Sequence, residues 1–195
     1  MIRAFGGIQT VGAAAQPVFG TTITAVGGFA PDQFTGKIGP GNNDVISSYT
    51  VNSVIGFLKG DRVVLGTGSK FVTPAVIGDL GNGTIIGIDT TNKILTIQGL
   101  VKQFAVNDFV VLAEVAQAVY ITPRITTGLT YIGTDETVAS TDPSVFDVIP
   151  IFAGTGVPYV GRYESGMNGN PFNLNQFWLK GTNTDTFFAR FQQVG

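Results

Sequence analysis

Two aspartates stand at matching places in a phrase that the sequence repeats. FLKGDRVVL, residues 57–65, returns as FAVNDFVVL, residues 104–112, so that Asp61 and Asp108 each come shortly before a Val-Val-Leu run. Paired carboxylates, one acting as acid and the other as base or nucleophile, carry out glycoside cleavage. A glycosidase is therefore one hypothesis for this pair of residues.

The same aspartates also have a local structural explanation. Gly60 precedes Asp61 and Asn107 precedes Asp108, and such pairs are typical of tight turns. The Asp carboxylate can accept bonds from nearby backbone N–H groups, while the preceding Phe covers the turn from the core side. No third polar group accompanies either carboxylate. We therefore predict structural turns at these four residues and no catalytic residue.

The composition excludes several kinds of chemistry. The chain of 195 residues contains no His and no Cys. It therefore has no disulfide, no thiolate metal site and no Ser-His-Asp triad, and it lacks the commonest general base. The acids follow no regular ligand spacing. From these features we expect no enzyme, no metal site and no cofactor.

Charge is scarce along the whole chain. Only 12% of the residues are charged, about half the ordinary share, and the net charge is −2. Eleven scattered Lys and Arg residues cannot form the basic stripe that neutralises a phosphate backbone, so we expect no nucleic-acid partner. Gly6, Gly7, Gln9 and Gly12 interrupt the apolar N-terminal stretch, which argues against a signal peptide and against a membrane span.

The pattern of apolar residues predicts an all-β fold. They alternate or form short blocks bounded by Gly, Asn, Asp and Thr, and no stretch has helical spacing with a capping signal. The repeat extends upstream of the aspartates, so one strand-turn-strand unit occurs twice. We predict an extended arm over 1–44, a small β-barrel-like module over 45–118 and an antiparallel β-sandwich-like module over 119–195.

The expected arm is rich in Gly, Ala and Thr. From Ala4 to Pro31 it carries no charge at all. Such a segment can acquire order by lying against the sheet edge of a neighbouring molecule, where its main chain forms the bonds. The alternative is a frayed terminus with one edge strand.

Three aromatic residues near the C-terminus are candidates for a binding platform. Phe172, Phe177 and Trp178 lie beside a loop dense in Gly and Asn, residues 166–176. An aromatic face flanked by amides is what sugar recognition requires. The alternative, which the sequence favours, is that these side chains pack in the core or at an oligomer contact.

Low charge and strand edges are typical of a permanent part of an assembly. Large uncharged surfaces dock without the cost of desolvating charges, and sheet edges accept strands from partners. We therefore expect a closed homo-oligomer or a protein bound to a larger lattice.

Two phrases near the C-terminus resemble small virion proteins of tailed bacteriophages. GLTYIGTDETVAST is followed by FNLNQFWLKGTNTDTFFARFQQV, which is similar to the YIG strand and closing hairpin of such proteins. The resemblance implies a capsid decoration or auxiliary head protein, commonly a homotrimer, that binds the major capsid protein on the virion surface. Neck and tail components share these phrases, and a receptor- or glycan-binding fibre or spike module is the alternative function.

Overall fold

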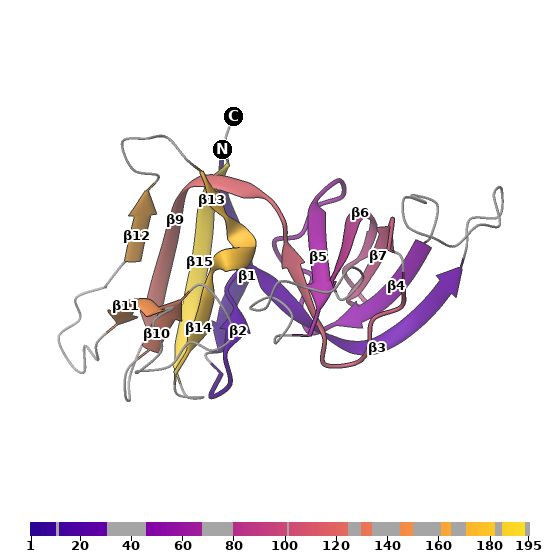
Figure 1. The fold of residues 1–195 in the computed structure, drawn as a ribbon, viewed down its shortest axis with the longest axis horizontal. Coiled ribbons are helices and arrows are strands. Elements are labelled where there is room, and N and C mark those ends of the chain that lie inside the picture. The colour runs from indigo at the N-terminus through magenta and orange to yellow at the C-terminus, as the bar shows by residue number, and fades with distance from the viewer. Residues whose placement is uncertain are drawn as a thin grey trace. The chain divides into compact units, whose positions relative to one another are not determined.

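In the described residues of the computed structural model nearly all of the regular secondary structure is β-strand, which confirms the predicted all-β fold (Figure 1). Its described chain divides into two units, Gly20–Ala113 on the one hand and Met1–Phe19 with Glu114–Gly195 on the other. Within the described residues no helix is long and apolar enough to cross a membrane. The structure describes residues 1–10, 12–30, 46–67, 80–100, 102–124, 130–133, 145–149, 161–164, 171–181 and 185–193.

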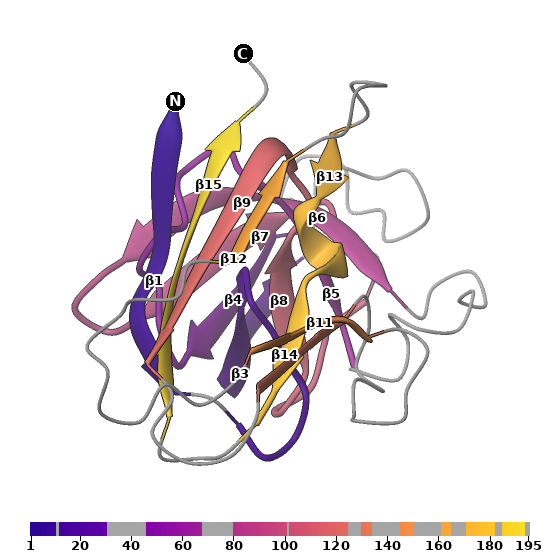
Figure 2. The ribbon, with the colours of Figure 1, turned by 90° about the vertical axis from the view of Figure 1, so that its left-hand side faces the viewer.

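The unit that contains both termini is built from two antiparallel sheets. The first sheet runs β1 (Ile2–Thr10), β15 (Thr186–Gln193), β9 (Val115–Arg124) and β12 (Gly161–Glu164), with β13 (Phe172–Asn173) also paired to β9. The second sheet runs β2 (Gln16–Pro17), β14 (Trp178–Lys180), β10 (Thr130–Gly133) and β11 (Val145–Ile149). Figure 2 shows the first sheet with β1 at one end and β12 at the other.

The order of the strands defines the topology of this unit. The chain changes sheet between β1 and β2, between β9 and β10, between β11 and β12, between β13 and β14, and between β14 and β15. The sheet orders β1-β15-β9-β12 and β2-β14-β10-β11 are those of a jelly roll, a sandwich made of two Greek keys. The predicted β-sandwich is thus present, and the barrel unit is inserted between β2 and β9.

Aromatic rings join the two sheets of the jelly roll. Phe19, two residues after β2, lies edge-on to Phe5 of β1 at 5.8 Å and to Phe191 of β15 at 5.4 Å between ring centroids. It also meets Phe177, the residue before β14, at 6.0 Å. Edge-to-face pairs of this kind each contribute about 0.5–1.5 kcal/mol beyond their burial. These rings therefore form the centre of the sandwich core.

The second unit is a closed barrel. Its strands follow the order β3-β4-β7-β6-β5-β8, which closes on β3. Alternate side chains of β4 and β7 point inward, and the buried residues include Tyr49 and Leu95. The strands are β3 (Gly20–Ala30), β4 (Ile46–Val51), β5 (Arg62–Gly66), β6 (Gly81–Asp89), β7 (Ile94–Gln98) and β8 (Phe109–Leu112).

The repeat is longer than the sequence indicates, because β3-β4-β5 and β6-β7-β8 are equivalent halves. Ile23 of β3 pairs with Val51 of β4, and at the corresponding place Ile85 of β6 pairs with Ile97 of β7. The register shift that follows Ile23 recurs after Ile85. A β-bulge is thus duplicated together with the strands around it.

The extended arm predicted over 1–44 is not confirmed. Its described residues form β1 and β2 of the jelly roll and β3 of the barrel, so the barrel begins at Gly20 and ends at Ala113 instead of spanning 45–118. The strand pattern of β1 is concealed by a bulge between Phe5 and Ile8, where Gly6 adopts a φ of 72°. Residues 31–45 lie outside the described part of the chain.

Candidate interaction surface

The two repeated aspartates cap tight turns, as the sequence predicts. The Asp61 carboxylate accepts the backbone N–H of Leu58 at 2.7 Å, and the Asp108 carboxylate accepts that of Ala105 at 2.8 Å. Both aspartates are buried. Gly60 before the first has a φ of 97°, a conformation that favours Gly.

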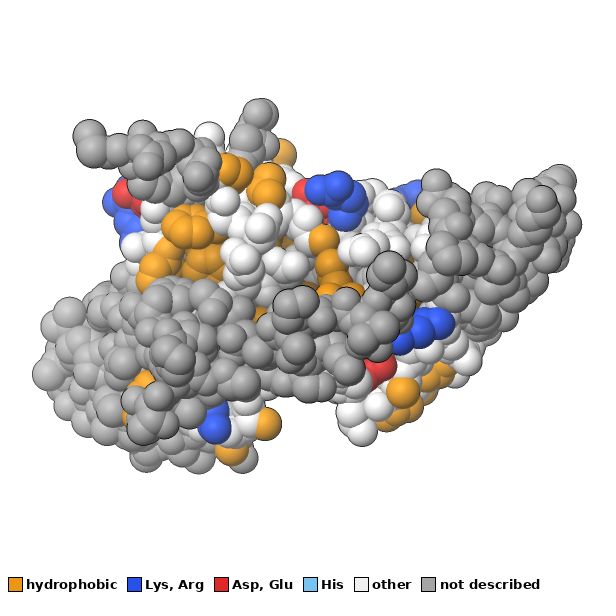
Figure 3. Space-filling view, in the orientation of Figure 1, with side chains coloured by type: hydrophobic (Ala, Val, Ile, Leu, Met, Phe, Trp, Pro, Cys, Tyr) orange, Lys and Arg blue, Asp and Glu red, His pale blue; other side chains and the backbone are white. Residues whose placement is uncertain are grey.

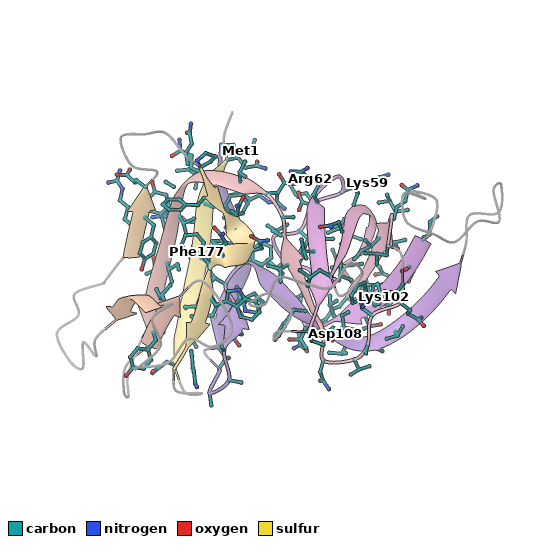
Figure 4. All side chains as sticks on the ribbon, in the orientation of Figure 1. Met1, Lys59, Arg62, Lys102, Asp108 and Phe177 are labelled. Carbon is teal, nitrogen blue, oxygen red and sulfur yellow. The ribbon has the colours of Figure 1, made fainter. Side chains whose placement is uncertain are left out.

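The two turns do not form a catalytic pair. Asn107 has a φ of 74°, so it takes the place of Gly60 in the second turn. The side chains of Lys59 in the first turn and Asp108 in the second lie toward opposite ends of the barrel (Figure 4). Because the carboxylates of Asp61 and Asp108 are each held by their own turn, they do not converge on one substrate.

The three aromatic candidates do not form an accessible platform. Trp178 is fully buried, and its indole N–H donates to the backbone oxygen of Asn175 at 3.0 Å. Phe177 is also buried and meets Phe172, which is partly exposed, in an edge-on contact at 5.6 Å. Phe177 and Trp178 therefore fit the alternative interpretation, in which these side chains pack in the core. Residues 165–170 of the adjoining loop lie outside the described part.

The solvent-facing side of the first jelly-roll sheet brings together an unusual set of side chains. Ala4 of β1, Arg190 of β15, Tyr120 of β9 and Arg162 of β12 are successive cross-strand neighbours, and we call them the outer-face row. The guanidinium carbon of Arg190 lies 5.2 Å from the centre of the Tyr120 ring, and that of Arg162 lies 5.8 Å from it. Two cations thus share one aromatic ring.

The two arginines of the row differ in their electrostatic surroundings. Arg162 forms an ion pair with Glu164, two residues along the same strand. The hydrogen bond and the charge of Glu164 raise the pKa of Arg162 above its ordinary value, and Tyr120 adds a smaller effect. Among the described side chains, Arg190 has no carboxylate partner and is exposed. Arg190 is therefore the cation of the row that is available to an anion.

Strand β1 is the end strand of this sheet in the described part of the chain. The carbonyl of Met1 accepts the N–H of Gln193 of the neighbouring strand at 3.1 Å. Bonded pairs alternate along an antiparallel ladder, so the backbone groups of Ile2 and Ala4 point away from β15. Four hydrogen-bonding groups, two N–H and two C=O, thus face outward on this edge.

The side chains of β1 leave this edge without an outward charge. Arg3, the only charged residue of β1, is buried and lies 5.5 Å from the centre of the Phe191 ring. Ile2 is 58% exposed, although it is a large apolar side chain. Proteins usually protect exposed edges with charge, Pro or a bulge. Here the bulge after Phe5 and the inward-pointing Arg3 are present, and among the described residues no further strand pairs with the outer side of residues 2–5.

Other exposed apolar side chains lie on the barrel turns, which are toward opposite ends of the barrel and so give no single surface. Ile55 is 60% exposed, Leu58 54% and Val106 48%. They lie in the segments that end in the two capped turns, and Figure 3 shows hydrophobic side chains among few charged ones on the face it displays. The backbone N–H of Leu58 is already bonded within its turn. The β1 edge is therefore the stronger candidate, because it offers backbone groups as well as apolar surface.

Sequence reasoning missed the outer-face row. Ala4, Tyr120, Arg162 and Arg190 are far apart in the chain, and only the sheet topology brings them together. One signal was present: Arg190 stands between apolar residues in the alternating phrase FFARF, which indicates an outward position.

Within the described residues no group of three or more His, Cys, Asp or Glu side chains is placed to hold a metal ion. Comparisons with protein-family models, with curated proteins and with solved structures find no match to this chain.

Proposed function

We propose that this protein is a non-enzymatic structural component of a viral particle, which it binds and reinforces through the first jelly-roll sheet. The observation that carries the proposal is the open edge of β1, with outward backbone groups at Ile2 and Ala4 and no outward charge. Such an edge on a free molecule invites pairing, and a strand from a permanent partner would satisfy its backbone groups.

The side chains next to this edge support the proposal. Tyr and Arg are enriched at the centres of protein interfaces, where they supply most of the binding energy. Arg190, Tyr120 and Arg162 form such a group on the same face as Ile2. Both guanidinium groups already lie close to the aromatic ring, so less freedom is lost when a partner binds.

The phage resemblance of the C-terminal phrases gives the class of assembly. It favours a capsid decoration or auxiliary head protein, a homotrimer seated on the major capsid protein. Jelly rolls are frequent in viral capsid proteins and also in lectins. Because a fold alone does not set a function, the β1 edge and not the topology carries the argument. The glycan-binding alternative has less support, since Trp178 is buried.

The test is the binding of purified protein to particles that lack it. An Ala4→Pro variant removes an outward N–H without removing a bond to β15, since edge strands tolerate Pro at such positions. We expect wild type to bind and Ala4→Pro to lose binding. Ala4→Ser, which keeps the N–H, is the matched control and should bind as wild type does.

Electron microscopy of particles carrying labelled protein then shows which contacts form. Density for β1 against a neighbouring chain is the expected result. A wild-type protein that stays monomeric and binds no virion component would overturn the proposal. The same conclusion would follow if Ala4→Pro, with a circular dichroism spectrum like that of wild type, bound particles fully.

A further inference from the structure

We infer that the partner segment at the β1 edge is an extended acidic stretch of another protein, which adds to the sheet as a strand and places a carboxylate near Arg190. This inference rests on the proposed function and names the chemistry of its partner. It is carried by two observations, the outward backbone groups of β1 and the cation of the outer-face row that has no carboxylate partner among the described residues.

The backbone geometry selects an extended partner. The outward groups at Ile2 and Ala4 alternate with the bonds that Arg3 and Phe5 make to β15. Only another strand presents donors and acceptors at that spacing. The bulge after Phe5 ends the regular edge, so the added strand pairs with residues 2–5.

The outer-face row then indicates which kind of side chain the partner strand carries opposite Ala4. Neighbouring strands lie about 4.8 Å apart, so a residue of the added strand opposite Ala4 is about 10 Å from Arg190 between Cα atoms. Glu and Arg side chains together span that distance. Ala4 is small and leaves the space between them open. A carboxylate at this place would extend the row as carboxylate, Ala4, Arg190, Tyr120 and Arg162.

The charge pattern disfavours two other occupants. A second copy pairing through its own β1 would present Ile2 and Ala4 on this face, and β1 contains no acid to meet Arg190. A nucleic acid needs a stripe of cations to neutralise successive phosphates, and among the described residues the row offers only Arg190 without a carboxylate partner. An acidic protein segment satisfies both the edge and Arg190.

The test uses the whole protein and an eight-residue peptide of alternating Glu and Thr, with a second peptide in which Gln replaces Glu. Binding is followed by NMR shifts of the amides of Ile2 and Ala4 and of the Nε–H group of Arg190. We expect the Glu peptide to shift these signals and the Gln peptide to bind more weakly. We also expect binding to weaken with added salt, because the pair is exposed.

Variants separate the backbone contribution from the charge contribution. Ala4→Pro should abolish binding of both peptides, and Ala4→Ser should not. Arg190→Gln should weaken the Glu peptide about two- to fivefold, as expected for an exposed ion pair, and leave the Gln peptide unchanged. Lys102→Gln, which removes the same charge from the barrel, is the control and should have no effect.

Several results would overturn the inference. Equal binding of the two peptides, an unchanged affinity in Arg190→Gln, or shifts confined to other residues would each do so. Dimerisation that Ala4→Pro abolishes would instead identify a second copy as the occupant. The particle assay tests the proposed function separately. If the protein binds particles through β1 but does not bind the Glu peptide, the proposed function stands and only this inference is overturned.

Discussion

Val64 of β5 pairs directly with Val111 of β8, and the two valines hold the same place in the repeated phrase. When the two copies of the phrase are exchanged, the pair on one side of Val64 becomes the pair on its other side. On the opposite wall Tyr49 pairs with its own counterpart Leu95. The barrel therefore has an approximate two-fold axis through these two pairs. Each of its two repeats, β3-β4-β5 and β6-β7-β8, supplies half of one shared interior.

This symmetry predicts equal roles for the two capping aspartates. Asp61→Ala and Asp108→Ala each leave a turn N–H without its acceptor, and each should lower the free energy of unfolding by about 1–3 kcal/mol. The measurement is urea denaturation followed by circular dichroism. Since the two turns lie toward opposite ends of the barrel, the double variant should show nearly additive losses.

Asp89 provides the control for these variants and a pH prediction of its own. Its carboxylate bonds Asn92 and the backbone N–H of Thr91, and these bonds, led by the one to the Asn92 backbone, lower its pKa from the ordinary 3.8. The stabilisation is present above pH 3.8 and is lost as pH falls through the lower folded value. NMR titration should show Asp89 ionised below pH 3.8. Asp89→Ala should cost less stability than Asp61→Ala, because Asp89 is partly exposed and Asp61 is buried.

Tyr49 makes the barrel sensitive to alkali. Burial raises the pKa of Tyr49 above its ordinary value of 10.0, and its hydroxyl accepts the backbone N–H of Phe104 at 3.1 Å. The unfolded chain therefore ionises first, so stability is retained below pH 10 and falls as pH rises above it. Denaturant titrations at increasing pH should show this fall. In Tyr49→Phe the part of the fall due to this phenol should disappear, with a lower stability at neutral pH.

Deleting residues 1–44 tests the assignment of the N-terminal segment. The deletion removes β1 and β2 from the jelly roll and β3 from the barrel. We expect both units to lose cooperative unfolding in a thermal scan, since each loses a strand that completes it. A deletion variant that melts as wild type does would mean that this segment is an arm after all.

Trp178 should behave as a core residue. Trp178→Ala removes a fully buried side chain and should lower stability by about 3–5 kcal/mol. The indole fluorescence of the native protein should be blue-shifted and should not respond to added sugars. Phe172→Ala, at a partly exposed position, is the milder comparison. Quenching of Trp178 by a glycan would support the alternative function instead.

Much of the fold could be predicted from local patterns. Alternation and turn residues indicated an all-β chain, and the repeat led to the Asp61 and Asp108 turns, because these features act within a few residues of sequence. The domain boundary could not be placed in this way. β1 pairs with β15 at the other end of the chain, and no local signal announces such a partner.

The candidate surface was harder to predict for the same reason. Arg190, Tyr120 and Arg162 become neighbours only through the pairing of three strands from separate parts of the chain. The low overall charge made an interface plausible but gave it no location. Arg3 shows that charge in the sequence does not always mark a surface position, because this residue is buried against Phe191.

The insertion of the barrel sequence between two parts of the jelly-roll sequence has one more consequence. The chain leaves the sandwich at Gly20 and returns after Ala113, and the strands at these two points, β3 and β8, are bonded neighbours. The points at which the chain enters and leaves the barrel thus lie side by side. A different module with adjacent ends could be inserted at the same point of the sequence, so the inserted module can change while the pairing of the jelly-roll strands is kept.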